Sequence, residues 1–197
     1  MKLSALFAGS LFMAVAAMPA SADQIVYTTP LGGSSEAPPN DSPGNGTARV
    51  TVDFDLVTMR VEESFSGLQG NVTASHIHCC TAVPGVGNIS VATTLPTFTD
   101  FPSGVTAGTY DHTFDMKDAS SYNPAFVTAN GSISGAFNAL VAGLNEGTAY
   151  ANIHSNIFPG GEIRGFLAPI PEPEAYAMLL AGLAMLGAVA RRRRRVV

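Results

Sequence analysis

Short runs of β-prone residues, each closed by glycine, proline, asparagine or serine, constrain the fold of this chain most. From Thr47 to Leu56 apolar and polar residues alternate, which is typical of a strand with one buried face. An antiparallel partner is expected from Met59 to Leu68. Other β-prone runs lie at 24–29, 72–79, 89–95, 109–116, 125–129, 148–154 and 162–167. Their spacing predicts an all-β, Greek-key-like antiparallel β-sandwich whose last two runs form a hairpin.

One stretch departs from this pattern. Between Gly131 and Gly143 the apolar residues recur at helical spacing, which predicts one short amphipathic helix packed on the sheets. Residues 31–46 are rich in glycine and proline, and they fit either a flexible linker or a loop between two strands.

The first 22 residues have the layout of an export signal. Lys2 precedes an apolar stretch that ends in small residues from Ala20 to Ala22. A signal peptidase recognises this order because a short apolar helix enters the export channel and a small-residue segment fits the protease. We predict a signal helix at 1–22, with cleavage after Ala22, and one domain at 23–168.

The C-terminal segment, 169–197, also has the features of a targeting signal. An uninterrupted apolar run at 175–190 ends at five arginines, Arg191 to Arg195. About 20 helical residues cross a bilayer, so a short membrane-spanning helix is predicted at 175–190. Arginines beside a span stay in the cytoplasm, which places the domain outside the inner membrane. Residues 23–170 carry four basic and thirteen acidic side chains, a balance that excludes nucleic acid as an expected partner.

Three histidines are candidate metal ligands. His76 and His78 lie two apart on an expected strand, so their imidazoles share one face. If the strand that ends at His154 lies nearby, three neutral imidazoles would suit zinc or copper, loosely as in the sandwich-fold superoxide dismutases. In the alternative interpretation, the histidines hydrogen-bond backbone groups, or Glu162 and Arg164, and hold the final hairpin.

The adjacent cysteines, Cys79 and Cys80, allow three outcomes. These are a disulfide between them, pairing between molecules, and metal ligation beside His78. We favour the disulfide because exported proteins fold in an oxidising compartment. Nothing in the sequence matches a catalytic triad, a phosphate loop or a paired-carboxylate site, so no enzymatic activity and no cofactor are expected.

Three stretches together resemble the CHRD domain, which is named after chordin. They are Glu36-Ala37-Pro38-Pro39, Ser75-His76-Ile77-His78, and Tyr150-Ala151-Asn152-Ile153-His154 with the following Pro159 to Gly165. The resemblance implies a β-sandwich without established catalytic activity, found in secreted and extracytoplasmic proteins. One departure is Cys79-Cys80, where many members have Gly-Pro.

The tail resembles a PEP-CTERM sorting signal. Its parts are Pro171-Glu172-Pro173, the apolar span, and the cluster that begins with Arg191, Arg192 and Arg193. The prolines keep the first part extended, so a membrane protease can reach its backbone. The resemblance implies processing by an exosortase after transient anchoring in the inner membrane with a cytoplasmic C-terminus.

Together these features predict a non-enzymatic protein of the cell surface or extracellular matrix. Its expected associations are with signal peptidase, exosortase, the inner membrane transiently, and exopolysaccharide, biofilm or outer-surface components. The alternative is an extracytoplasmic zinc or copper protein that uses His76, His78 and His154.

Overall fold

The computed structural model of the chain describes residues 23–170, 180–186 and 191. The predicted signal peptide with Ala20 and Ala22, the Pro171-Glu172-Pro173 motif, and Arg192 and Arg193 lie outside the described residues. The strands are β1 (Gln24–Gly32), β2 (Asn45–Asp53), β3 (Thr58–Ser66), β4 (Val72–His78), β5 (Gly108–Asp115), β6 (Tyr150–Ser155), β7 (Ile163–Phe166) and β8 (Ala168–Pro169). The helices are η1 (Gly33–Ser35), η2 (Ala119–Ser121), α1 (Pro124–Ala129) and α2 (Ile133–Glu146).

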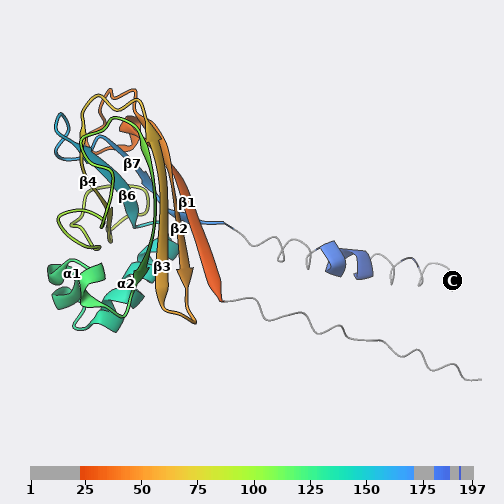
Figure 1. Cartoon of the computed structure of the whole chain (residues 1–197). Coiled ribbons are helices and arrows are strands. Elements are labelled where there is room, and N and C mark those ends of the chain that lie inside the picture. The colour runs from red at the N-terminus through yellow and green to blue at the C-terminus, as the bar shows by residue number, and fades with distance from the viewer. Residues whose placement is uncertain (1–22, 171–179, 187–190, 192–197) are drawn as a thin grey trace, which may run out of the picture.

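The strands pair in the order β4-β6-β7-β1-β2-β3-β5, and β8 pairs with β1. All of these pairings are antiparallel. Only Gly32 and Arg164 join β1 to β7, and at this point the strands divide into the layers β1-β2-β3-β5 and β4-β6-β7 (Figure 1). The chain crosses from the first layer to the second between β3 and β4, returns to the first layer at β5, and crosses to the second again at β6. The predicted all-β antiparallel sandwich is therefore confirmed, and so is the hairpin of β6 and β7.

Alternation along the strands builds the core. Val50 and Val61, directly paired on β2 and β3, are fully buried. Ile77 and Ile153, from β4 and β6, are fully buried in the same apolar cluster. Each such side chain contributes about 1.5–3 kcal/mol of stability by leaving water. The core thus fixes which face of β4 and β6 points inward.

The predicted amphipathic helix is α2. The Ser132 side chain accepts a hydrogen bond from the Gly135 N–H at its start, and Gly147, in the left-handed conformation, ends it. Buried Leu140 and Leu144 join the core cluster. The helix was predicted between Gly131 and Gly143, and the structure places it there but extends it to Glu146.

The prediction of a strand at 125–129 was wrong, because this segment belongs to α1. The side chain of Asn123 accepts a hydrogen bond from the N–H of Ala125 at 3.0 Å, and Pro124 occupies the first turn. Asparagine before a proline is a strong signal for a helix start. That signal outweighs the β-propensity of the residues that follow.

The prediction of a strand at 89–95 was also wrong. Val91 and Thr93 form only isolated bridges within a long loop between β4 and β5. The N–H groups of Ala92 and Phe98 donate to the carbonyls of Ile77 and Ser75. The loop therefore covers the outer edge of β4, which would otherwise expose unpaired backbone groups.

The glycine- and proline-rich stretch at 31–46 is a loop of the domain rather than a linker. β1 and β2 pair directly on either side of it, and Asn40 Nδ2 donates to the carbonyl of Glu162 at 3.0 Å. In the tail, residues 180–186 are helical. Among the helices that the structure describes, none has the length and apolar character needed to cross a bilayer.

Candidate metal centre

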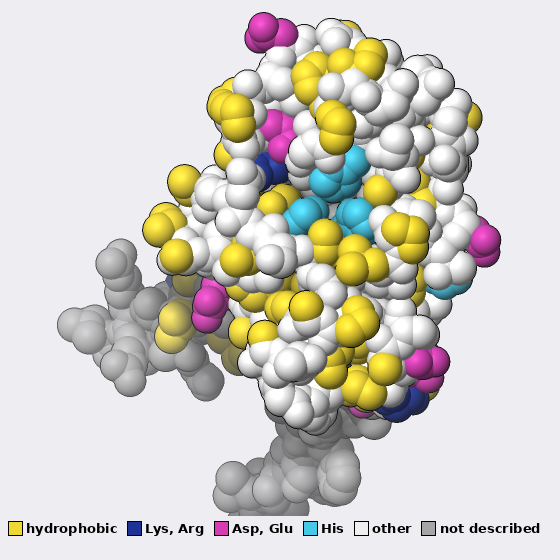
Figure 2. Space-filling model, turned by 90° about the vertical axis from the view of Figure 1, so that its left-hand side faces the viewer, with side chains coloured by type: hydrophobic (Ala, Val, Ile, Leu, Met, Phe, Trp, Pro, Cys, Tyr) yellow, Lys and Arg dark blue, Asp and Glu magenta, His cyan; other side chains and the backbone are white. Residues whose placement is uncertain are grey.

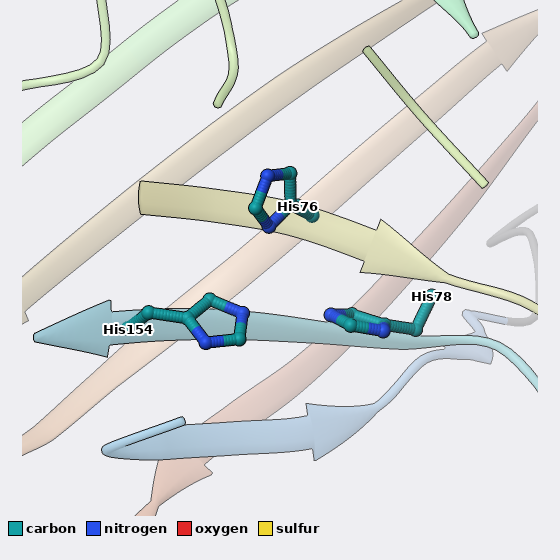
Figure 3. A group of neighbouring side chains, drawn as sticks. All are labelled: His76, His78 and His154. Carbon is teal, nitrogen blue, oxygen red and sulfur yellow. The ribbon is translucent and has the colours of Figure 1, made fainter. Parts of the chain in front are cut away.

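The pairing of β4 with β6 brings three histidines to one surface. His76 lies opposite Asn152, His78 opposite Tyr150, and His154 opposite Ala74. Residues two apart on a strand share a face, and the intervening Ile77 and Ile153 fill the core. The histidines therefore occupy the outer face of the β4-β6-β7 layer, grouped over the two strands (Figure 3).

The three rings are close enough to share one ion. One nitrogen from each of His76, His78 and His154 lies within 4.8 Å of the other two, and the ring centroids are 5.3–5.9 Å apart. Zinc–nitrogen bonds of about 2.0–2.1 Å in a tetrahedral site separate such nitrogens by about 3.4 Å. Metal binding would therefore require side-chain rotations that bring the three nitrogens closer together.

Each imidazole is oriented by a backbone carbonyl. His76 Nε2 contacts the Pro96 oxygen at 2.7 Å, His78 Nδ1 the Ile89 oxygen at 2.8 Å, and His154 Nδ1 the Pro159 oxygen at 3.0 Å. A carbonyl can only accept, so each of these nitrogens carries the proton and donates it. The other nitrogen of each neutral ring is left with its lone pair.

Those three lone-pair nitrogens are His76 Nδ1, His78 Nε2 and His154 Nε2. Each is buried and has no hydrogen-bond partner among the described residues. An N–H held by a carbonyl on one side and a free lone pair on the other is the usual arrangement of a metal-ligating histidine.

Burial keeps the rings neutral. It lowers the pKa of His76 and of His78 to about 4, and it lowers the pKa of His154 as well. Neutral imidazole is the form that binds a metal ion. His112, the other histidine in the chain, lies on β5 and stacks with Tyr110, so the structure does not bring it to this cluster.

The alternative interpretation offered backbone groups, or Glu162 and Arg164, as partners of the histidines. The backbone contacts are present for all three rings, whereas Glu162 and Arg164 make their hydrogen bonds elsewhere. The Glu162 carboxylate accepts hydrogen bonds from Ser42 Oγ at 2.6 Å and from the Gln69 and Gly70 N–H groups. These contacts fasten the loop at 31–46 and the turn after β3 to the start of β7.

Arg164 instead holds the covering loops beside the cluster. Its guanidinium donates to the carbonyls of Ser35 and Gly87 and to the side chain of Asn88, and it lies 3.7 Å from the Glu36 carboxylate. Burial raises the pKa of Glu36 to about 7, and the charge of Arg164 opposes that rise. In the sequence Glu36 stands out only as part of a motif, because nothing local indicates a buried pair with β7.

An aromatic residue connects this ion pair to the histidines. The Tyr150 ring stacks on His78, with centroids 4.7 Å apart, and the Arg164 guanidinium lies 4.8 Å from the Tyr150 centroid. Tyr150, itself covered by Arg164, thus supports one face of the His78 ring.

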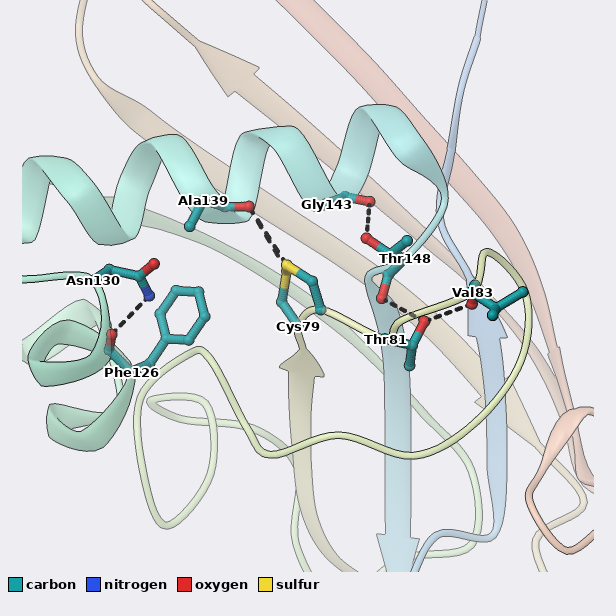
Figure 4. Close-up of a disulfide and its surroundings, with 9 residues drawn as sticks. Cys79, Thr81, Val83, Phe126, Asn130, Ala139, Gly143 and Thr148 are labelled. Atoms are coloured by element: carbon teal, nitrogen blue, oxygen red, sulfur yellow. Dashed lines mark hydrogen bonds between the residues drawn. A yellow bond between two sulfur atoms is a disulfide. The ribbon is translucent and has the colours of Figure 1, made fainter.

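Cys79 and Cys80 are joined by a disulfide directly after His78. Cys79 is buried against α2, where the Cys80 sulfur lies 3.5 Å from the carbonyl oxygen of Ala139 (Figure 4). Neither sulfur belongs to the group of candidate ligands, which in the described part of the chain consists of the three histidines.

The comparisons with known proteins agree with the fold. Residues 27–167 match the CHRD domain family, and residues 169–195 match the PEP-CTERM protein-sorting motif. No curated protein and no solved structure matches the chain. The first match covers most of the chain and contains all three clustered histidines. The chain therefore belongs to the CHRD domain family, and its C-terminal motif identifies an exported protein that an exosortase processes.

Proposed function

We propose that this exported domain binds a zinc or copper ion through His76, His78 and His154. The observation that carries the proposal is the convergence of three buried lone-pair nitrogens that lack hydrogen-bond partners in the described structure. Leaving a buried acceptor unpaired costs about 1–3 kcal/mol. One metal ion would satisfy all three nitrogens together.

The donor type selects the metal. Neutral imidazole suits zinc and copper, whereas calcium and magnesium prefer carboxylate and carbonyl oxygens. The backbone carbonyls of Ile89, Pro96 and Pro159 hold the three rings in fixed tautomers, which is the support that bound metals require. The proposed role is metal binding outside the cytoplasm, without turnover of a substrate.

We also propose that the processed domain acts at the cell surface or in the extracellular matrix. The sorting motif supports this location, because it directs a protein through the membrane to exosortase. Mass spectrometry of the exported protein should recover peptides of residues 23–170 and none from the Arg191 cluster. Recovery of the intact tail on surface protein would contradict processing.

The metal proposal is tested on the exported protein after chelator treatment and dialysis. Titration with Zn(II), and separately with Cu(II), should give one ion per chain. His76→Gln, His78→Gln and His154→Gln should each weaken binding by at least about tenfold, since each removes one of three ligands. His112→Gln is the matched control, because this histidine lies outside the cluster.

Circular dichroism of each variant checks that the domain remains folded. Wild-type protein that binds no stoichiometric metal would refute the proposal. The proposal would also be refuted if the folded single variants of His76, His78 and His154 bound metal as tightly as His112→Gln does.

A further inference from the structure

The three-histidine cluster supplies fewer ligands than a closed zinc site uses. In the described part of the chain, no cysteine, aspartate, glutamate or further histidine joins the group. Structural zinc sites take four protein ligands, whereas three protein ligands leave one position for water or an exogenous molecule. A metal ion bound to these three histidines therefore has one coordination position that the protein does not fill.

The sheet blocks one side of that position. The histidines lie on the outer face of β4 and β6, and their strand neighbours Ile77 and Ile153 fill the core on the other face. The space-filling view shows histidine side chains gathered at the surface, with apolar and uncharged groups around them and a basic and an acidic group on one side (Figure 2). His154 is the least buried of the three. The three donor nitrogens are themselves buried, so the vacant position would open outward beside His154, on the side away from the sheet.

The loop segments around the three-histidine cluster supply no imidazole, thiolate or carboxylate of their own. Residues 86–99 and 155–161, which supply the three orienting carbonyls, contain no charged residue and no cysteine. They carry exposed apolar side chains instead, Ile89 at 38%, Leu95 at 49% and Ile157 at 54% exposure. A molecule from outside would thus meet an uncharged edge along these segments, with the Arg164–Glu36 pair beside Tyr150 as the charged part of the border.

We propose that the metal held by His76, His78 and His154 keeps one exchangeable position open to solvent, where it binds small monodentate donor molecules. The inference rests on the proposed metal function and adds the class of ligand that the bound ion accepts. Azide and imidazole represent this class, because each binds a metal through one atom.

The test uses exported protein that has been loaded with Cu(II) and shown by elemental analysis to hold one ion per chain. Azide is then added while the charge-transfer absorption and the electron paramagnetic resonance spectrum are recorded. We expect a saturable new absorption band and a changed spectrum, and imidazole should displace azide. Loaded protein whose spectra do not respond to either ligand would overturn the open position.

A variant that closes the position provides the matched comparison. Ala74 lies opposite His154 and shares the outer face with His76, so Ala74→His places a fourth imidazole beside the cluster. This variant should retain one copper per chain and weaken azide binding by at least about tenfold. Azide binding equal to that of wild type in the loaded variant would contradict the proposed geometry.

The two proposals fail in distinguishable ways. If the wild-type protein takes up no metal, the proposed function fails at the loading step, before any azide is added. If it takes up one ion and the spectra ignore azide and imidazole, metal binding stands and the open position is refuted.

Discussion

Replacing Glu63 with glutamine should change how the stability of the domain depends on pH. Glu63 lies on β3 in phase with the inward residues Val61 and Phe65, and it is 3% exposed. Its Oε2 accepts a hydrogen bond from Ser75 Oγ at 2.9 Å, across the two layers. Its Oε1 has no hydrogen-bond partner in the described structure.

Burial raises the pKa of this carboxyl to about 8 from an ordinary 4.5, and the Ser75 hydrogen bond opposes the rise only in part. The folded protein therefore keeps the Glu63 proton at pH values where the unfolded chain has lost it. The contribution of Glu63 to stability is greatest below about pH 4.5 and falls by about 1.4 kcal/mol per pH unit until about pH 8. Across that window, this one group lowers the free energy of unfolding by roughly 5 kcal/mol at most.

Glu63→Gln removes the titration and keeps an oxygen for Ser75. The variant also buries an amide N–H₂ at the position of Oε1, which costs about 1–3 kcal/mol. We therefore expect it to be less stable than the wild type near pH 5 and more stable near pH 8. Urea unfolding of the processed protein at several pH values measures this difference.

Glu62→Gln is the matched control, because Glu62 lies next to Glu63 on β3 and faces Arg49 and Arg60 at the surface. Its effect should be below about 1 kcal/mol throughout. A Glu63→Gln difference that stays constant between about pH 5 and pH 8 would refute the reasoning that Glu63 is buried with its proton.

Three further predictions concern the metal centre and its support. Zn(II) affinity should hold down to about pH 5, because protons compete for His76 and His78 only near their lowered pKa of about 4; a loss beginning near pH 6.5 in a competition titration would contradict this. Gly143→Ala should destabilise the domain by about 1–3 kcal/mol in urea unfolding, since a Cβ there overlaps both disulfide sulfurs. As the control, Gly160→Ala has open space around the added Cβ and should change stability by less than about 0.5 kcal/mol. Arg164→Lys should cost about 2–4 kcal/mol, because an ammonium cannot reach the loop oxygens and the Glu36 carboxylate together; unchanged unfolding would show that the guanidinium does not hold the loops.

Local patterns in the sequence were enough to predict most of the sandwich. The alternation from Thr47 to Leu56 and its partner run predicted β2 and β3, since each pattern lies within one strand and a short turn joins them. The same local rule placed His76 and His78 on one face. The prediction of a strand at 125–129 was wrong because the Asn123 cap and Pro124 start a helix there, which overrides the β-propensity of the following residues.

The rest of the site depends on contacts between distant segments. His154 reaches the other histidines only through the pairing of β4 with β6, which alternation within one strand cannot specify. The carbonyls of Ile89 and Pro96 come from an irregular loop with no periodic pattern. Glu63 is in phase with apolar neighbours, and this was the one available sign that its carboxyl is buried.

X-ray absorption at the metal edge of the zinc- or copper-loaded protein tests the central claim most directly. We expect about three imidazole nitrogens at about 2.0–2.1 Å from the metal, with one further oxygen or nitrogen donor completing the coordination. The imidazole signal should fall in His154→Gln and remain in His112→Gln. A first shell of sulfur or of oxygen alone would contradict a metal centre built from His76, His78 and His154.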